Sequence, residues 1–319
     1  MIDLYNRVID YMRISITDRC NLRCVYCRPE TARALPESEL LTFPEILRIC
    51  CEGSRLGIRF VKLTGGEPLM RDGVPQLVDL LKTKAGIERV SLTTNGILLS
   101  RYIDALQDAG IDGITVSLDT LDPERFKSIT GSPRLADILS AVQASMARNI
   151  PVKINAALIG GGEPAWRDLA ELAKTETLTV RFIEMMPLGY GSRFQGVRND
   201  AILDRMRKIY PGIVEDSADR GAGPAVYYRI PNFKGRIGFI SAMSHSFCHT
   251  CNRIRLTADG VLKPCLCYAS GIDAKAALRN GSVRQALLDA VALKPRSHCF
   301  VQANPEKPLE TRLMSAIGG

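Results

Sequence analysis

The sequence predicts an α/β protein built on a partial (β/α)6 barrel of the TIM type, with a C-terminal extension. Over roughly the first 190 residues, apolar β-branched segments alternate with amphipathic ones, which predicts parallel strands joined by right-handed helical crossovers. Six such units occur, fewer than a closed eight-stranded barrel needs. Polar residues or glycines also lie at the end of each predicted strand, where barrels of this kind carry their active sites.

The predicted strands and helices follow one another in a regular order. The strands are expected at residues 11–17, 59–64, 89–94, 113–119, 152–158 and 179–185. One helix begins after Thr42, which is suited to cap it, and ends at Gly57. Gly86 and Gly110 are expected to end two further helices, and residues 135–146 carry their apolar side chains on one helical face.

The unusual residues gather after these strands. The stretch TDRCNLRCVYC (17–27) follows the first strand, TGGEP (64–68) the second and TTNG (93–96) the third. SLD (117–119) ends the fourth strand, Lys153 and Asn155 lie in the fifth, and RFIEMM (181–186) closes the sixth. A scaffold alone would need only apolar residues there, so the sequence predicts a site in the mouth of the barrel.

Composition limits the class of protein. The N-terminus carries charges and no apolar run approaches a bilayer span, so we expect neither a signal peptide nor a membrane span, and a cytoplasmic location. Ten cysteines in such a chain indicate reduced thiols that bind metal. The formal charge of +8 and the sequence pI near 9.0 favour an anionic partner.

The chain is expected to divide near residue 188. Beyond it, glycine-rich loops replace the strand–helix alternation. We therefore predict a barrel over residues 1–188 and a C-terminal substrate-binding region with a second cysteine set over residues 189–319.

Cys20, Cys24 and Cys27 form a C-x₃-C-x₂-C run. Structural zinc needs four ligands, and no fourth cysteine or histidine stands near these three. A [4Fe–4S] cluster held by three cysteines leaves one iron open to another ligand, and we favour it over buried thiols or a zinc ion with a distant ligand.

The run resembles the signature of the radical S-adenosylmethionine superfamily, with an aromatic residue, Tyr26, before the third cysteine and GGEP after the second strand. The resemblance implies that the open iron binds S-adenosylmethionine and that one electron cleaves it to a 5′-deoxyadenosyl radical. It carries over Tyr26, Gly66, Ser117 and Met186 as residues that bind S-adenosylmethionine. Packing alone would also explain Met186, and a strand cap would explain Ser117.

Cys248, Cys251 and Cys265 form a second set, C-x₂-C-x₁₃-C. A zinc ribbon would show two CxxC pairs, and CLC at 265–267 is a poor second pair, so a second [4Fe–4S] cluster is again favoured. Cys267 either completes this site or packs beside it. Cys50, Cys51 and Cys299 are interpreted as structural thiols.

Here the resemblance narrows to the GTP 3′,8-cyclase family of molybdenum cofactor biosynthesis. The matching segments run from about Asp10 to Gly319 and comprise TGGEPLMRDG, LTTNGILL, SLDTLDPERF, VKIN, RFIEMMPLG, CNRIRLTADGVLKPCL and the terminal GG. The family implies that the second cluster binds the guanine base of GTP. It implies GTP contacts from Arg13, Lys62, Thr93, Lys153, Arg253, Ile254 and Arg255, and entry of the Gly318–Gly319 tail into the active site.

This chain differs from the family at two positions near the residues expected to bind the triphosphate of GTP. Lys62 stands where an arginine is usual, and Phe60 where a second basic residue is common. Arg59 is the residue that could compensate.

The family reaction begins with removal of the 3′-hydrogen of GTP and closes a ring between C3′ and C8. It gives (8S)-3′,8-cyclo-7,8-dihydroguanosine 5′-triphosphate, a carbon–carbon lyase reaction and the first step of the cofactor pathway. The resemblance also implies an external electron donor, a homodimer, and hand-off of the product to cyclic pyranopterin monophosphate synthase.

Two other classes of protein share some of these features. A peptide-modifying radical enzyme would usually carry more cysteines in its C-terminal region and would not need these basic residues at strand ends. A basic zinc-containing nucleic-acid-binding protein would not need the six strand-end motifs and would show clustered aromatics for base stacking. We expect neither a nucleic acid nor a membrane as partner.

Overall fold

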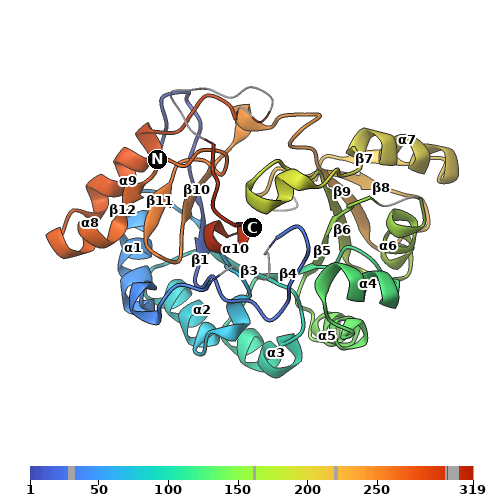
Figure 1. Ribbon diagram of the computed structural model, residues 1–319, viewed down its shortest axis with the longest axis horizontal. Helices are drawn as coiled ribbons and strands as arrows, with labels where there is room; N and C mark the ends of the chain where they lie inside the picture. The colour runs from blue at the N-terminus through green and yellow to red at the C-terminus, as the bar shows by residue number, and fades with distance from the viewer. Residues whose placement is uncertain (28–32, 161–162, 219–221, 299, 301–308, 319) are drawn as a thin grey trace.

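Twelve strands form one curved sheet in the part of the chain that the computed structural model describes, residues 1–27, 33–160, 163–218, 222–298, 300 and 309–318 (Figure 1). The strand order is β12-β11-β10-β1-β2-β3-β4-β5-β6-β9-β8-β7. The six predicted strands occupy its centre and are parallel: β1 (Tyr11–Ser15), β2 (Phe60–Thr64), β3 (Arg89–Thr94), β4 (Gly113–Ser117), β5 (Val152–Ala157) and β6 (Thr179–Ile183). The partial barrel is thus confirmed.

The C-terminal region extends this sheet at both edges. β10 (Arg253–Leu256) lies parallel to β1, and β9 (Arg236–Ile240) lies parallel to β6. The antiparallel strands outside them are β7 (Val214–Asp216), β8 (Val226–Arg229), β11 (Val261–Lys263) and β12 (Ile272–Asp273). The loss of strand–helix rhythm did not reveal these edges, because no helical crossover leads directly into β9 or β10.

Helices cover the outer side of the sheet and leave its inner side facing a central space (Figure 1). In the first, the Thr42 hydroxyl accepts a hydrogen bond from the Glu45 amide and the Glu45 carboxylate accepts one from the Thr42 amide, as the sequence predicts. The helices are α1 (Phe43–Arg55), α2 (Val74–Thr83), α3 (Leu99–Asp108), α4 (Pro123–Thr130), α5 (Leu135–Ala147), α6 (Glu163–Thr175), α7 (Asn199–Ile209), α8 (Ala274–Asn280), α9 (Val283–Ala292) and α10 (Met314–Ile317).

Strand alternation decides which side chains reach the inner side. In β1, Met12 and Ile14 are fully buried in the apolar core, whereas Arg13 between them lines the central cavity. Successive side chains of a strand point to opposite faces, so one strand supplies both the core and the site. Cys50 and Cys51 lie on α1 and pack in or against the same core, which agrees with their structural interpretation; Cys299 lies outside the described residues.

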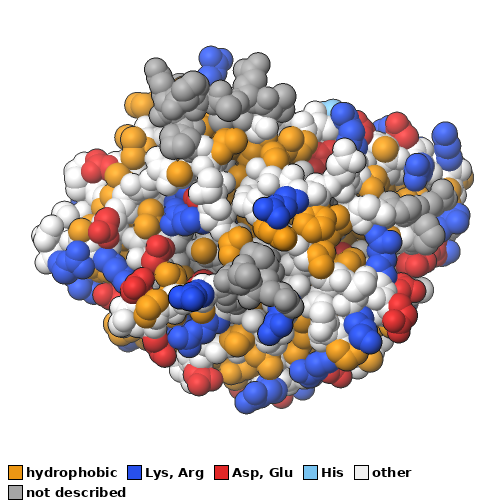
Figure 2. Space-filling view, in the orientation of Figure 1, with side chains coloured by type: hydrophobic (Ala, Val, Ile, Leu, Met, Phe, Trp, Pro, Cys, Tyr) orange, Lys and Arg blue, Asp and Glu red, His pale blue; other side chains and the backbone are white. Residues whose placement is uncertain are grey.

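The C-terminus lies in the middle of the ring of strands, beside the short helix α10 (Figure 1). On the same face, apolar, lysine and arginine side chains surround the centre, and the visible acidic side chains lie mostly toward the rim (Figure 2). Among the described residues, no helix is long and apolar enough to cross a bilayer.

Candidate active site between two cysteine sets

A cavity of about 340 Å³ opens on the inner side of the sheet. Residues of β1 to β6, β9 and β10 line it, together with the loops that follow them. Most of the predicted site residues line it: Cys20, Cys24, Tyr26, Cys27, Arg13, Lys62, Gly66, Thr93, Ser117, Met186, Cys248, Cys251, Arg253, Arg255 and Cys265. The structure therefore brings both cysteine sets and most of the predicted cations to one space.

Three predicted residues that the structure describes, Lys153, Ile254 and Gly318, do not line the cavity. Ile254 is fully buried in the apolar core, because its neighbours Arg253 and Arg255 take the inner face of β10. Lys153 lies close enough to Lys62 to affect its pKa, and its ammonium stands 5.8 Å from the centre of the Tyr227 ring. Gly318 lies just behind the cavity wall, as described below, and Gly319 is outside the described residues.

The loop with the first cysteine set lies against the GGEP segment. The amides of Gly66 and Glu67 donate to the carbonyls of Thr17 and Arg19, each at 2.7 Å. A Cβ atom on Gly66 would stand 2.3 Å from the Arg19 carbonyl oxygen, so only glycine permits this approach. The GG of GGEP is therefore explained by backbone packing against the cysteine loop.

Glu67 organises the other side of this loop. Its carboxylate accepts hydrogen bonds from the Thr94 hydroxyl at 2.7 Å, the Asn95 amide at 2.6 Å and the Leu69 amide at 3.0 Å. The Asn95 side chain in turn donates to the Cys20 sulfur at 3.7 Å and to Asn21 at 2.8 Å. Complete burial raises the pKa of Glu67 to about 7, although these hydrogen bonds oppose the shift. Glu67 thus orients the cysteine loop.

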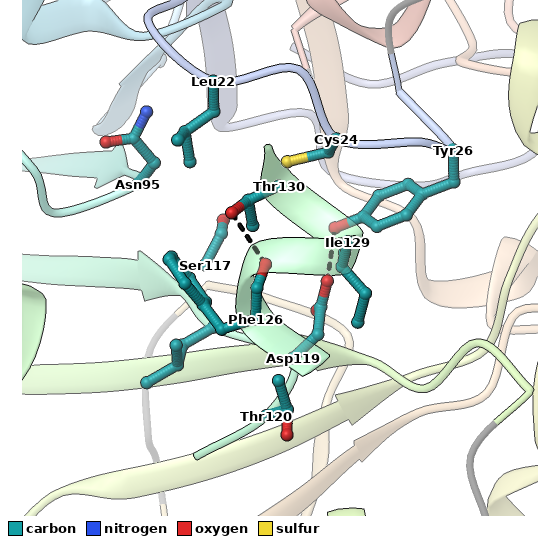
Figure 3. A pocket seen from close by; sticks show the side chains of 11 residues that line it. Leu22, Cys24, Tyr26, Asn95, Ser117, Asp119, Thr120, Phe126, Ile129 and Thr130 are labelled. Carbon is teal, nitrogen blue, oxygen red and sulfur yellow. Dashed lines mark hydrogen bonds between the residues drawn. The ribbon is translucent and has the colours of Figure 1, made fainter. Parts of the chain in front are cut away.

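A narrow pocket beside Cys24 contains a buried tyrosine–aspartate pair (Figure 3). The Tyr26 hydroxyl donates to Asp119 at 2.7 Å, and the second Asp119 oxygen accepts from the Ala157 amide at 2.8 Å. Burial raises the pKa of Asp119 to about 6, and burial and Asp119 raise that of Tyr26. The pair holds the aromatic ring of Tyr26 next to two cysteines of the first set.

The second cysteine set lies among cations. Burial opposes the ionisation of Cys251, but Arg253 and Lys294 outweigh it and lower the pKa of this thiol to about 7. A guanidinium nitrogen of Arg253 and the ammonium of Lys294 each lie 3.7 Å from the Cys251 sulfur. The Cys267 amide donates to the Cys265 sulfur at 3.4 Å, and Cys267 itself is buried at the cavity wall.

The donor chemistry fits clusters better than a single ion. All six cysteines are free thiols that line one cavity, and Cys20, Cys24 and Cys27 are close enough to influence one another's ionisation. Among the residues described, no three Cys, His, Asp or Glu side chains converge as one bound ion would require. Thiolates are the usual ligands of iron–sulfur clusters, so three cysteines in each set fit such a group.

A row of cations crosses three neighbouring strands. Arg255 of β10, Arg13 of β1 and Lys62 of β2 are aligned side by side in the sheet register. Burial and their neighbouring cations lower the pKa of each, and Lys62 also donates to the Thr115 hydroxyl at 3.0 Å. Such a row is unfavourable in the empty protein and favourable around a multiply charged anion.

Four cations of this wall lack a carboxylate partner among the residues that the structure describes. Within the described part of the chain, no ion pair joins a carboxylate to Lys62, Arg181, Arg253 or Arg255. The Thr93 hydroxyl is buried there without a hydrogen-bond partner among the described residues. The wall can therefore receive the phosphates of a nucleotide.

Family models match both parts of the chain. The Radical SAM superfamily model matches residues 14–175, and the Molybdenum Cofactor Synthesis C model matches residues 178–300. The chain is 43% identical to a GTP 3′,8-cyclase of Heliobacterium modesticaldum and 41% identical to one of Clostridium perfringens, with complete coverage of each sequence. The chain belongs to the GTP 3′,8-cyclase family.

Family membership makes this protein an enzyme with a role in molybdenum cofactor biosynthesis. The radical SAM match supports a [4Fe–4S] cluster and S-adenosylmethionine as its cofactors. The fold is also similar to Streptococcus suis SuiB bound to S-adenosylmethionine, with a TM-score of 0.61, 16% identity, and coverage of 84% of this chain and 63% of that one. That likeness concerns the fold alone.

In this member of the cyclase family, the C-terminal tail reaches the cavity wall. The Gly318 carbonyl accepts a hydrogen bond from Arg255 at 2.5 Å. A Cβ atom on Gly318 would lie 2.9 Å from the Thr64 side chain and 3.1 Å from Ser15, and its φ of +75° also favours glycine. The first glycine of the pair is thus fitted between β1 and β2.

One expectation about the phosphate side is wrong. Arg59 does not compensate for the absence of a basic residue at position 60, because it points away from the cavity to Glu88, with contacts of 2.6 and 2.7 Å. Phe60 instead lies between the guanidinium groups of Arg59 and Arg89.

Sequence reasoning missed several residues of this site. Arg181 lines the cavity and donates to Asn155 at 2.9 Å, and both stand in strand-end motifs that could have identified them. Asn95 was likewise visible in TTNG. Lys294 had no signal, because it follows a helix far from any motif and only the fold brings it to Cys251.

Proposed function

We propose that this enzyme converts GTP to (8S)-3′,8-cyclo-7,8-dihydroguanosine 5′-triphosphate, the first step of molybdenum cofactor biosynthesis. The observation that carries this proposal is the single cavity that holds both cysteine sets and a cationic wall. A radical generated at one set can act on a nucleotide bound at the other only if both open to the same space.

The first cysteine set is proposed to hold the cluster that binds S-adenosylmethionine. When bound, cluster and S-adenosylmethionine together supply a 5′-deoxyadenosyl radical after one electron enters. Asp119 and Ala157 fix the Tyr26 ring beside the cysteine loop, and Gly66 lets the loop approach β2. We assign Tyr26, Gly66, Ser117 and Met186 to S-adenosylmethionine because all four line the cavity near this loop.

The second cysteine set, Cys248, Cys251 and Cys265, is proposed to hold a second [4Fe–4S] cluster that binds the guanine base. The nearby cations are proposed to hold the ribose and triphosphate, with Arg253 and Arg255 nearest this set and Arg13 and Lys62 further along the wall. Guanidinium groups bind phosphate oxygens in pairs, and ammonium groups act as point charges. Thr93 and Arg181 complete the wall. Lys153 lies on the same face of β5 as Asn155 and is proposed to add its charge to the phosphate side, and Ile254 is proposed to contact GTP through its backbone.

This arrangement suits a reaction confined to one substrate. The chain holds the 3′-carbon of GTP near the first set and C8 near the second, so that loss of the 3′-hydrogen leads to ring closure rather than to side reactions. The Gly318–Gly319 tail is proposed to line this space at the point where Arg255 holds the Gly318 carbonyl.

Three further parts of the proposal concern partners and organisation. The reaction consumes electrons, so an external electron donor is required, and the product passes to cyclic pyranopterin monophosphate synthase. We also propose a homodimer, to be tested by sedimentation of the intact chain. The division into residues 1–188 and 189–319 assigns the radical chemistry to the first region and base recognition to the second.

The test is anaerobic purification followed by iron and sulfide analysis and incubation with S-adenosylmethionine, dithionite and GTP. About eight irons per chain and a cyclised nucleotide with the mass of GTP, formed together with 5′-deoxyadenosine, are expected. GTP carrying deuterium at C3′ should transfer it to the deoxyadenosine. Deoxyadenosine without a cyclised nucleotide would refute the proposed substrate, and about four irons would refute the second cluster.

A further inference from the structure

Lys294 is buried beside the second cysteine set and makes three contacts there. Only 4% of the residue is exposed. Its ammonium donates to the carbonyl of Arg253 at 2.7 Å, to the carbonyl of Pro264 at 3.0 Å and to the sulfur of Cys251 at 3.7 Å. One side chain thus links the start of β10, the residue before Cys265, and Cys251 itself.

The segment that follows Lys294 contacts the other cysteine of the CxxC pair. The His298 amide donates to the Cys248 sulfur at 3.3 Å. Residues 294–298 therefore contact both thiols of the pair, although they lie more than 40 positions further along the chain.

Arg7 fastens this segment from the N-terminus. Its guanidinium donates to the carbonyls of Cys248 at 2.7 Å, Pro295 at 2.7 Å and Arg296 at 3.1 Å, and it is itself held by Asp3 at 2.6 Å. Because Arg7 and Asp3 are each only 6% exposed, their ion pair is largely shielded from water, and Arg7 fixes the position of the segment.

We infer that Lys294 is a positioning residue for the second metal centre, which it holds in place and whose reduction potential it raises. This inference rests on the second cluster of the proposed function. A positive N–H donor at a ligand sulfur stabilises the more reduced, more negative state of a cluster, so its presence raises the potential. The two carbonyl bonds keep the ammonium aimed at Cys251.

Lys294→Gln is the principal variant, because it removes the charge and keeps an amide that can donate to a carbonyl. Lys294→Arg keeps the charge. Arg296→Gln is the matched control: it removes one positive charge two residues along the same segment, from an exposed side chain that contacts neither cysteine.

The measurement is the reduction potential of the second cluster, followed by electron paramagnetic resonance in a chain whose first set is removed by Cys20→Ala, Cys24→Ala and Cys27→Ala. Lys294→Gln is expected to shift the potential to more negative values. The potential of Lys294→Arg should stay nearer that of the parent chain, and the potential of Arg296→Gln should equal that of the parent chain. A Lys294→Gln potential equal to that of Arg296→Gln, at full iron content, would overturn the inference.

A second measurement detects the contact directly in the parent chain, and only its assignment to Lys294 uses a variant. In the parent chain labelled with ¹⁵N-lysine, pulsed electron–nuclear spectroscopy of the reduced second cluster should detect coupling to a lysine nitrogen that Lys294→Arg removes. A parent with no such coupling would refute the contact. A parent without iron at the second set would instead refute the proposed second cluster, and the inference with it, so the two failures are distinguishable.

Discussion

The two cysteine sets have the same number of ligands and opposite electrostatic surroundings. At the first set, the pKa of the Cys24 thiol lies well above its ordinary value, because the thiol is buried and its neighbours are Cys27, Asp119 and Cys20. At the second, Arg253 and Lys294 lower the pKa of Cys251 to about 7 despite burial. The difference agrees with the two proposed tasks, since an acidic neighbourhood suits a sulfonium cation such as S-adenosylmethionine and a basic one suits an anionic nucleotide.

The largest expected effect comes from removing one thiol at a time, from the first set in one variant and from the second set in another. Cys24→Ser is expected to lower formation of 5′-deoxyadenosine at least about 1,000-fold, because the first cluster is lost. Cys251→Ser should abolish the cyclised product to a similar degree but leave some cleavage of S-adenosylmethionine. Both products are quantified by liquid chromatography with mass detection, and Cys51→Ser on α1 is the control. Equal loss of both products in the two variants would contradict the division of tasks.

The first region should also respond to pH through Glu67. Its pKa is raised from 4.5 to about 7, so the folded protein binds a proton more tightly than the unfolded chain does. Its contribution to stability is present below about pH 4.5 and is lost as the pH rises through about 7, with a total change of about 3 kcal/mol.

The check is denaturant unfolding of the metal-free protein at several pH values, with Glu67→Gln as reference. Wild type is expected to lose stability relative to this variant between pH 5 and pH 8. A constant difference over that range would show that Glu67 does not titrate as proposed.

The close packing of Gly66 against the cysteine loop gives the next largest expected effect, a loss of stability. Gly66→Ala places a methyl group 2.3 Å from the Arg19 carbonyl oxygen and should cost about 2–3 kcal/mol, because neither backbone segment can yield freely. Gly281→Ala meets no atom within 4 Å, although its φ is +68°, and should cost only about 1 kcal/mol. Thermal unfolding compares the two variants. Similar losses would mean that the cysteine loop adjusts to the added methyl group.

The cationic wall gives the smallest expected change. Lys62→Met should weaken GTP binding by about 2 kcal/mol, roughly thirtyfold, since a buried cation that lines the cavity is lost. Lys153→Met should weaken it less, because Lys153 does not line the cavity. Equilibrium dialysis measures the binding of GTP and of guanosine to each variant. Guanosine binding should stay unchanged, because guanosine carries no phosphate. An equal loss for guanosine would place Lys62 at the base rather than at the phosphates.

The sequence itself carried the order of strands and helices in the barrel. Alternation of apolar and polar residues, and capping residues such as Thr42, are local signals, and the structure follows them closely. Cysteine spacing likewise predicted two thiol-lined sites: Cys20, Cys24 and Cys27 lie on one short loop, and the CxxC pair of the second set is equally local.

Only the tertiary structure decided which strands and cysteine sets lie next to one another. The pairing of β10 with β1 puts Arg255 beside Arg13 and brings the second cysteine set to the cavity of the first. Strand pairing at the edge of a sheet depends on distant parts of the chain, so no local pattern announced it. The same holds for Arg7 and Lys294, which reach Cys248 and Cys251 from opposite ends of the sequence. Local chemistry therefore specified the ligands, and long-range packing specified their electrostatic surroundings.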